Sequence, residues 1–262
     1  MIMSKLQDVW KTDNYYQKAR NAILSSQSDE IHLLIELGKN AKRILDIGCG
    51  EGTRLFLVSG KKAKGIGVDI SEKAIRLAGR QYPQFNFCVA DSSRLPFASN
   101  TFDLVYSAFV LEHVLDPEKI INEAIRVTKS GGLICFIAPN YGAPNRCSPN
   151  FNGSRFIKLC AGIILDMAIA FKNSTTLKWN SVQPKSGKIY EMDSDTTVEP
   201  YINSLISYLV ANRLIIKKYD SCWKEELAGA KMHQQLFAFF AKIGFYPFKM
   251  WGPRLLIVAK KT

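Results

Sequence analysis

Short apolar runs alternate with longer mixed segments through the first half of the chain. The runs cover residues 43–47, 65–68, 85–89, 104–106 and 133–138, and polar or helix-like sequence follows each of them. Continuous apolar runs are typical of strands that are buried on both faces, and their alternation with helices is typical of parallel α/β sheets. The pattern therefore predicts an α/β domain whose strands all end at one edge of the sheet.

The second half of the chain has a less regular pattern. Residues 141–153 are rich in proline, asparagine and glycine and are predicted to form a loop. Residues 155–172 form an apolar helix that Lys158 and Asp166 interrupt, so its apolar run is too short to span a bilayer. We expect a buried lid helix here, and the alternative is an interfacial helix that faces lipid.

The remaining elements complete the sheet. Residues 173–198 are polar and are expected to form a loop over the active site, and residues 201–212 have the apolar spacing of a core-facing helix. Residues 214–219 and 255–259 are predicted to be the sixth and seventh strands. The insertion between them contains a predicted helix at residues 226–243.

A glycine-rich turn follows the first apolar run and contains Gly48, Gly50 and Gly52. Asp69 ends the second run, 21 residues after Gly48. Glycine allows a positive φ and a close approach of the backbone to a ligand, and a carboxylate at this position can accept hydrogen bonds from ribose hydroxyls. The turn therefore predicts a nucleotide-type cofactor, although a tight turn without a ligand has the same pattern.

The spacing and charge of this turn favour one class of cofactor. A nicotinamide site normally has G-x-G-x-x-G, whereas the third glycine comes one residue earlier here, and Asp46 and Glu51 add negative charge. A pyrophosphate would be poorly stabilised beside these carboxylates, whereas a cationic sulfonium ligand would be well stabilised. A nicotinamide-dependent oxidoreductase is the more distant alternative.

The motifs DIGCGEG and VDIS, with the stretch from VADSSRLPF to FIAPN, resemble class I S-adenosylmethionine-dependent methyltransferases. The resemblance covers about residues 43–140, and it is to the broad branch that includes ubiquinone-biosynthesis and small-molecule methyltransferases. It implies S-adenosyl-L-methionine as the cofactor. It also implies a Rossmann-like, mostly parallel seven-stranded sheet of order 3-2-1-4-5-7-6, with the last strand antiparallel and helical insertions after strands 5 and 6.

The resemblance further assigns a set of cofactor-binding residues at or near the ends of the first four strands. These residues are Asp46, Gly48, Cys49, Gly50, Gly52, Asp69, Ile70, Asp91, Ser92 and Ser107. Asp46 and the glycine turn would hold the methionine end, and Asp69 would bind the ribose. Ile70, Asp91 and Ser92 would contact the adenine, and the backbone of Ser107 would lie beside the methionine moiety. Asp103, at the opposite end of its strand, is expected to be structural.

His113 is the candidate general base, because it follows the fourth strand and titrates near neutrality. A packing role for this histidine is the alternative, and His32 and His233 are weaker candidates. Tyr15 or Tyr16 could close over the cofactor and Arg20 could meet a carboxylate. The alternative for this N-terminal segment is an amphipathic helix that packs on the sheet.

Charge and cysteine content bear on partners and metals. The formal net charge is +12, and it is uneven, with 18 Lys and Arg against 15 Asp and Glu in residues 1–142 but 17 against 8 in residues 143–262. This excess indicates an anionic acceptor or a peripheral contact with an acidic membrane surface, or simply a solvated basic surface. The basic residues are dispersed, which argues against nucleic acid as a partner.

Six cysteines without a C-x-x-C pair, and only three histidines, predict reduced thiols and no metal site. The first ten residues lack a signal-peptide pattern, so a cytoplasmic location is expected.

We expect four parts along the chain. Residues 1–42 would be a helical segment or lid, residues 43–141 the cofactor-binding core, and residues 142–200 an insertion over the substrate. Residues 201–262 would complete the same domain, with a helical insertion at about residues 223–252.

The predicted function is methyl transfer to a small-molecule or glycan/glycolipid acceptor by O-methylation. Residues 192–213 also weakly resemble methyltransferases of polysaccharide and cell-envelope glycan synthesis, which favours a glycan acceptor. The alternative is a methyltransferase-like module with a regulatory or partner-binding role.

Overall fold

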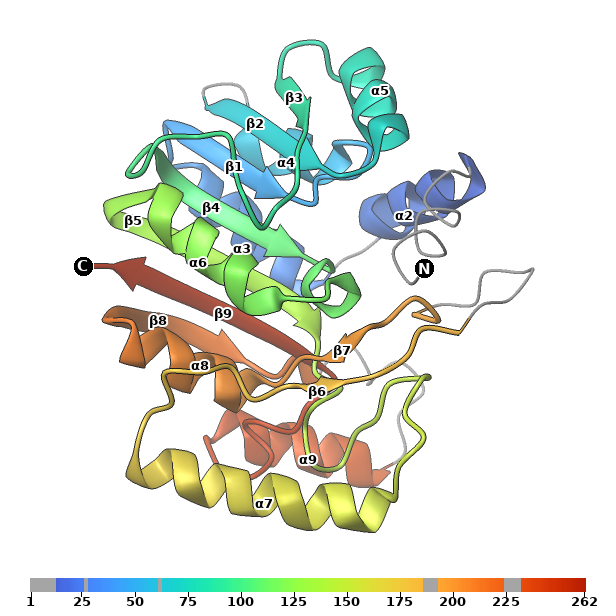
Figure 1. Ribbon diagram of the computed structural model, residues 1–262, viewed down its shortest axis with the longest axis vertical. Coiled ribbons are helices and arrows are strands. Elements are labelled where there is room, and N and C mark those ends of the chain that lie inside the picture. Colours follow the sequence, from blue (N-terminus) through green and yellow to red (C-terminus); the bar gives the residue numbers. More distant parts are fainter. Residues whose placement is uncertain (1–12, 26–27, 61–62, 186–192, 224–231) are drawn as a thin grey trace. The chain divides into compact units, whose positions relative to one another are not determined.

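The computed structural model describes residues 13–25, 28–60, 63–185, 193–223 and 232–262 (Figure 1). The chain divides into two compact units. The first comprises Met1–Val110, Asp116–Cys135 and Lys261, and the second comprises Leu111–Leu115, Phe136–Lys260 and Thr262.

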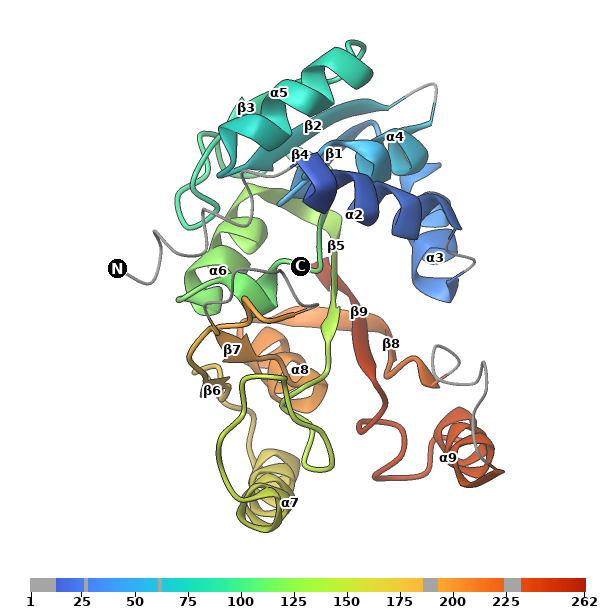
Figure 2. The ribbon, with the colours of Figure 1, turned by 90° about the vertical axis from the view of Figure 1, so that its right-hand side faces the viewer.

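The first unit contains alternating helices and strands. They are α2 (Asp13–Ser25), α3 (Asp29–Gly38), β1 (Arg43–Ile47), α4 (Thr53–Ser59), β2 (Lys64–Asp69), α5 (Glu72–Gln81), β3 (Asn86–Val89), β4 (Phe102–Ala108), α6 (Pro117–Val127) and most of β5 (Thr128–Pro139). Helices α3 and α4 cover one face of the strands and α6 covers the other (Figures 1 and 2). Coverage of both faces explains why β1 and β4 are buried along almost their whole length.

The second unit contains the end of β5 and the C-terminal elements. They are the short helix η1 (Leu111–His113), α7 (Arg155–Phe171), β6 (Asn180–Ser181), β7 (Val198–Glu199), α8 (Ile202–Ala211), β8 (Leu214–Asp220), α9 (Met232–Lys242) and β9 (Arg254–Lys261). Strands β6 and β7 form a separate antiparallel pair. The helix predicted at residues 226–243 is α9, and its predicted part at residues 226–231 lies outside the described residues.

The main sheet has seven strands in the order β3-β2-β1-β4-β5-β9-β8, mostly parallel with the last strands antiparallel. Since β8 and β9 are the predicted sixth and seventh strands, the predicted order 3-2-1-4-5-7-6 is confirmed. The register pairs Ile47 with both Val68 and Ser107, and it pairs Asp69 with Val89. The carboxyl ends of β1 to β4 therefore meet at one edge of the sheet.

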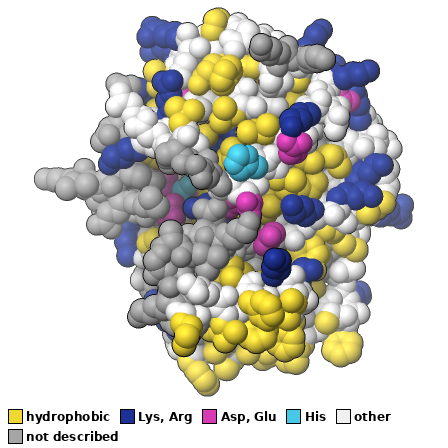
Figure 3. Space-filling model, turned by 180° about the vertical axis from the view of Figure 1, so that it is seen from behind, with side chains coloured by type: hydrophobic (Ala, Val, Ile, Leu, Met, Phe, Trp, Pro, Cys, Tyr) yellow, Lys and Arg dark blue, Asp and Glu magenta, His cyan; other side chains and the backbone are white. Residues whose placement is uncertain are grey.

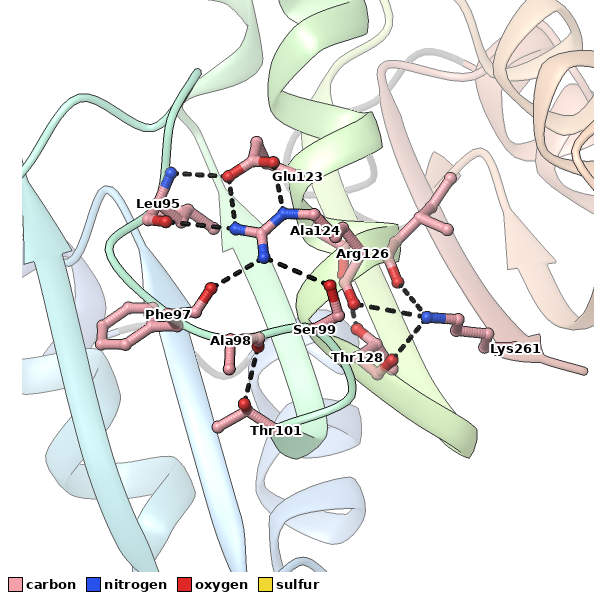
Figure 4. A network of polar contacts seen from close by, with 11 residues as sticks. Leu95, Phe97, Ala98, Ser99, Thr101, Glu123, Ala124, Arg126, Thr128 and Lys261 are labelled. Carbon is pink, nitrogen blue, oxygen red and sulfur yellow. Dashed lines mark hydrogen bonds and ion pairs between the residues drawn. The ribbon is translucent and has the colours of Figure 1, made fainter.

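A network around Arg126 holds the loop that follows β3 (Figure 4). The Arg126 guanidinium donates to the carbonyl oxygens of Leu95 (3.1 Å) and Phe97 (2.7 Å), and it pairs with the Glu123 carboxylate at 2.6 Å. Lys261 Nζ donates to the carbonyl oxygens of Ile125 (2.7 Å) and Thr128 (2.8 Å), near the junction of α6 and β5. These bonds satisfy main-chain acceptors that secondary structure leaves open.

Asp103 has the structural role that the sequence predicts. Its Oδ2 accepts hydrogen bonds from the backbone N–H groups of Lys42 (3.1 Å) and Arg43 (2.8 Å), and Lys129 donates to its Oδ1 at 2.6 Å. The carboxylate thus joins the beginnings of β1, β4 and β5, at the edge opposite the carboxyl ends.

The prediction of a buried helix at residues 155–172 is wrong in one respect, because the apolar side chains of this helix are exposed. The buried residues of α7 are Lys158 and Asp166, whereas Phe156, Ile164 and Phe171 are exposed. The helix exists at the predicted position, but it packs through its polar side because that side finds hydrogen-bond partners in the same unit.

Candidate cofactor site

The turn between β1 and α4 takes left-handed backbone conformations at Gly48, Gly50 and Gly52, with φ of +74°, +55° and +86°. A Cβ on Gly48 would lie 2.2 Å from Val110 Cγ2, so packing alone requires glycine there. A Cβ on Gly50 would meet no atom within 4 Å. The backbone at Gly50 therefore borders open space, as a loop that receives a ligand must.

Hydrogen bonds fix this turn to the end of β2. The N–H groups of Gly48 and Cys49 donate to the Val68 carbonyl at 2.8 and 2.9 Å, and the N–H of Gly50 donates to Asp69 Oδ2 at 2.9 Å. The backbone N–H of Ser71 donates to Asp69 Oδ1 at 2.8 Å. Burial raises the pKa of Asp69, although these N–H groups oppose the rise.

Both oxygens of Asp69 thus accept backbone N–H groups. A carboxylate has about four acceptor positions in total, so Asp69 can still accept a ribose hydroxyl. The structure adds a role that the sequence did not predict, because Asp69 also holds the glycine turn in place.

Asp46 is fully buried near the end of β1. The hydroxyl of Tyr106 donates to its Oδ2 at 2.8 Å, and its Oδ1 has no hydrogen-bond partner among the described residues. Burial raises the pKa of Asp46 to about 7, although the charge of Arg54 and the Tyr106 hydrogen bond lower it. A buried acceptor without a donor is costly, and a cationic ammonium group of a ligand would satisfy it.

Ser107 lies on β4 in register with Ile47. Its side chain is fully buried, and its Oγ has no hydrogen-bond partner in the described part of the chain. The residue is therefore at the expected edge of the sheet, beside the glycine turn.

The residues expected to contact adenine follow β2 and β3. Ile70 and Asp91 are exposed and Ser92 is half-buried. The N–H of Ala90 donates to the Asp69 carbonyl at 3.0 Å, which holds the two strand ends together. An exposed apolar residue and a carboxylate at one edge can accommodate the face and the amino group of a purine.

Tyr16 of α2 lies at the same edge. It is buried, and its hydroxyl donates to Ser71 Oγ at 2.8 Å, two residues beyond Asp69. Burial raises the pKa of this hydroxyl, so it stays protonated and able to donate. Of the two tyrosines that the sequence offered, Tyr16 thus has the contact expected of a group that closes over the cofactor, while Tyr15 packs edge-on against it.

Two residues of this site had no signal in the sequence. Tyr106 lies within an apolar strand, where it resembles a core residue, and Arg54 occupies the first turn of α4, where an arginine is usually solvated. In the structure Arg54 is buried and its Nη1 donates to the Ala108 carbonyl at 3.2 Å. Its positive charge beside Asp46 is evident only from the fold.

His113 belongs to a separate polar cluster in the second unit. Its Nδ1 lies 3.3 Å from Asp195 Oδ1, and its Nε2 lies 3.7 Å from Glu112 Oε1. Burial lowers the pKa of His113, but the charges of Glu112, Asp195 and Asp193 outweigh it, so that the net shift is upward. Burial raises the pKa of Glu112 to about 7.

Thr197 holds this cluster to the chain around β7. Its N–H donates to the Glu112 carbonyl at 2.8 Å, and its Oγ1 donates to the Val114 carbonyl at 2.8 Å. The sequence indicated His113 but not its carboxylate partner Asp195, which lies 82 positions later. His32 is exposed on α3, and the side chain of His233 lies outside the described residues.

All six cysteines lie in the described part of the chain, and no disulfide joins any of them. Within the described residues, no group of three or more His, Cys, Asp or Glu side chains has an arrangement that could hold a metal ion.

Residues 45–136 match a methyltransferase domain family. The chain is 34% identical over 104 residues to the demethylmenaquinone methyltransferase of Renibacterium salmoninarum. The aligned segment covers 38% of this chain and 44% of that protein. It is 29% identical over 192 residues to the putative 23S rRNA (guanine-N(1)-)-methyltransferase YxjB of Bacillus subtilis. That aligned segment covers 62% of this chain and 66% of the relative. The chain spans less than half the length of the first of these relatives.

Among solved structures, the chain is similar to a geranyl diphosphate methyltransferase in complex with S-adenosylmethionine. The TM-score is 0.55 at 13% identity, over 96% of this chain and 92% of that one. At this identity the similarity shows a common fold, and the match at residues 45–136 includes the glycine turn, Asp69 and Asp91.

Proposed function

Because residues 45–136 form a class I S-adenosylmethionine-dependent methyltransferase domain, we propose that the protein methylates a hydroxyl group of a small-molecule, glycan or glycolipid acceptor. The observation that carries the proposal is the glycine turn, where open space at Gly50 adjoins the Asp69 carboxylate. Asp46 adds a buried acceptor without a partner among the described residues.

Each residue of the first unit has a proposed role. Asp46 Oδ1 accepts a hydrogen bond from the ammonium group at the methionine end, and the turn from Gly48 through Cys49 to Gly52 borders that end. Asp69 accepts hydrogen bonds from the ribose hydroxyls, and it also accepts them from the backbone N–H groups of Gly50 and Ser71.

The other end of the cofactor would meet more exposed residues. Ile70 packs on the adenine, Asp91 accepts from the adenine amino group, and Ser92 lies beside it. Tyr16 covers this edge through its hydrogen bond to Ser71 and helps to exclude water.

The bound cofactor supplies a methyl group that a sulfonium already activates, so the protein mainly has to position the acceptor. Asp46 and Asp69 place negative charge where a cation binds, which favours the sulfonium over an anionic phosphate. Desolvation inside the site strengthens these interactions.

Transfer to a hydroxyl also requires removal of its proton, and His113 is the proposed base. Asp195 lies beside Nδ1 and favours the tautomer that has its proton on that nitrogen, which leaves the lone pair on Nε2. In this role His113 Nε2 would take up the proton of the acceptor hydroxyl, while the bound cofactor would supply the methyl group.

The distribution of charge along the chain bears on the acceptor class. Residues 143–262 have 17 Lys and Arg against 8 Asp and Glu, which favours an anionic acceptor such as an acidic glycan or glycolipid. The Bacillus subtilis relative is named for a ribosomal RNA guanine, so structured RNA is the competing acceptor class. A methyltransferase-like binding module is the alternative function.

Methyl transfer from radiolabelled S-adenosylmethionine tests the proposal. Acidic glycans, glycolipids, small hydroxylated molecules and ribosomal RNA would be offered separately, with Asp69→Ala as the control that should lose transfer. Label on a hydroxyl oxygen of a small molecule, glycan or glycolipid supports the proposal, and label only in RNA would overturn the proposed acceptor class. Cofactor binding without transfer to any class would favour the binding module.

A further inference from the structure

Helix α7 has its apolar side chains on the outside and its charged side chains on the inside. Lys158 and Asp166 are buried and lie eight positions apart, on one face of the helix. Six large apolar residues are exposed, namely Phe156, Ile157, Ile163, Ile164, Met167 and Phe171. Phe171 is 92% exposed. A helix on the surface of a water-soluble domain normally has the opposite arrangement.

The inward face of α7 is fixed by its charges. Lys158 Nζ donates to Glu199 Oε2 at 2.5 Å and to the Tyr141 carbonyl at 2.8 Å. Four donors of the same unit hydrogen-bond to the Asp166 carboxylate at 2.6 to 3.2 Å, namely Tyr201, Asn203, Tyr246 and Trp251. A rotation that buried the apolar face would break these contacts and expose the partners unpaired. The outward apolar face is therefore built into the fold.

Helix α9 has a second apolar stripe. Met232, Leu236, Phe239 and Ile243 are exposed and follow helical spacing along one face. Helices α7 and α9 lie at the same end of the second unit and run in a similar direction in Figures 1 and 2. Figure 3 shows hydrophobic side chains gathered at the lower end of that view. The ten exposed residues of α7 and this stripe are named here the α7/α9 apolar surface.

Basic residues border this surface. Arg155 begins α7, Lys172 follows it and Lys242 ends α9, and all three are exposed. Residues 155–172 and 232–243 contain one acidic residue, Asp166, and its carboxylate is directed inward. An apolar stripe with basic flanks matches the acyl boundary and the phosphates of an anionic lipid leaflet. Long basic side chains can reach the phosphates while their stems stay on apolar surface.

The same charges argue against self-association. A symmetric contact would place Arg155, Lys172 and Lys242 of one copy near those of the other, without acidic residues on these segments to balance them. Among the described residues, no helix is long and apolar enough to cross a bilayer. A contact in the plane of a bilayer would bury the apolar stripe and would place its basic border at the lipid headgroups.

We propose that the α7/α9 apolar surface docks the protein onto an anionic lipid bilayer, with α7 lying along the boundary between headgroups and acyl chains. Arg155, Lys172 and Lys242 contact the lipid phosphates. This docking needs no cofactor and no methyl acceptor, so it stands or falls independently of the proposed function.

Flotation with vesicles tests the docking. The full chain should float with phosphatidylglycerol/phosphatidylcholine vesicles and bind phosphatidylcholine vesicles about tenfold more weakly, with a similar loss in high salt. The triple variant Ile164→Ser/Met167→Ser/Phe171→Ser should lose about tenfold or more in binding to the anionic vesicles. Ile215→Ser is the matched control, because Ile215 is comparably exposed on β8, and it should bind as the wild type does.

Two further measurements keep the result interpretable. The triple variant should keep the thermal midpoint and the S-adenosylhomocysteine affinity of the wild type. In the single variant Phe171→Trp, the added fluorescence should shift to shorter wavelength with anionic vesicles. Absence of that shift, equal flotation of the triple variant, or failure of the wild type to bind would each overturn the proposal. A wild-type dimer that the triple variant dissociates would assign the surface to a second copy and overturn it too.

Discussion

The N–H of Gly50 donates a hydrogen bond of 2.9 Å to Asp69 Oδ2, and this bond joins the glycine turn after β1 to the end of β2. Asp69 therefore has an observed and a proposed role. Its carboxylate fixes the turn that would receive the methionine end, and the same carboxylate would bind the ribose. Its loss should affect the cofactor at both places.

Asp69→Ala should weaken S-adenosylhomocysteine binding. Leaving buried donors unpaired costs on the order of 1–3 kcal/mol, which corresponds to roughly 5- to 150-fold in affinity. Isothermal titration calorimetry would measure the change, and Asp69→Asn should lose less because it keeps one acceptor oxygen. Affinity equal to that of the wild type would contradict the ribose assignment.

Gly60→Ala is a control for the effect of Gly50→Ala on cofactor binding. Both glycines have a φ of +55°, and a Cβ at either would meet no atom within 4 Å. Gly50→Ala should lose roughly 1 kcal/mol of stability because of its positive φ. Gly60→Ala should lose more, because a φ of +55° with a ψ of −149° lies in a region that essentially only glycine adopts. Only Gly50→Ala should also weaken cofactor binding, since its methyl group enters the open space. Equal binding by the two variants would show that the ligand does not approach Gly50.

Cofactor affinity should rise with pH through the titration of Asp46. Burial raises the pKa of this carboxyl to about 7 against the opposing effects of Arg54 and Tyr106, and the charges of Asp69 and Glu51 raise it further. A cationic ligand against Oδ1 lowers that pKa, so binding releases a proton, and affinity should increase between about pH 5 and 7.

Calorimetry in buffers of different ionisation enthalpy would count the released proton. Asp46→Asn should abolish both the release and the pH dependence, whereas proton uptake by the wild type on binding would exclude this role for Asp46.

The strands and the glycine turn were predictable because their signals are local. An apolar run such as residues 43–47 and a glycine with positive φ leave their pattern in neighbouring residues. Tyr106 and Arg54 could not be assigned, because their contacts with Asp46 and Ala108 depend on the register of strands distant in sequence. The spacing of Lys158 and Asp166 places them on one face of α7, but only partners such as Glu199 and Tyr201 decide that this face is buried.

The rate of methyl transfer should rise with pH if His113 is the base. A base must be unprotonated, and the carboxylates around His113 raise its pKa above the ordinary 6.5 despite the effect of burial. The half-maximal rate should therefore lie above pH 6.5, and Asp195→Asn should move it to lower pH because one raising charge is gone. A pH–rate profile unchanged in His113→Gln would remove this residue from catalysis.

Lys158→Ala should strongly destabilise the second unit. It leaves Glu199 buried without its cation, which costs about 3–5 kcal/mol for such pairs. Lys119→Ala is the control, because its 3.0 Å pair with Asp116 is exposed and contributes roughly 0–1 kcal/mol. Urea unfolding would compare the two, and similar losses would show that the buried pair adds little.

The most direct test of the cofactor assignment is equilibrium binding of S-adenosylhomocysteine and of NADH to the wild-type protein, measured by calorimetry. The turn at Gly48, Gly50 and Gly52, with Asp46 and Asp69, predicts saturable one-site binding of S-adenosylhomocysteine, competition by S-adenosylmethionine and no binding of NADH. Tight binding of NADH without binding of S-adenosylhomocysteine would contradict it.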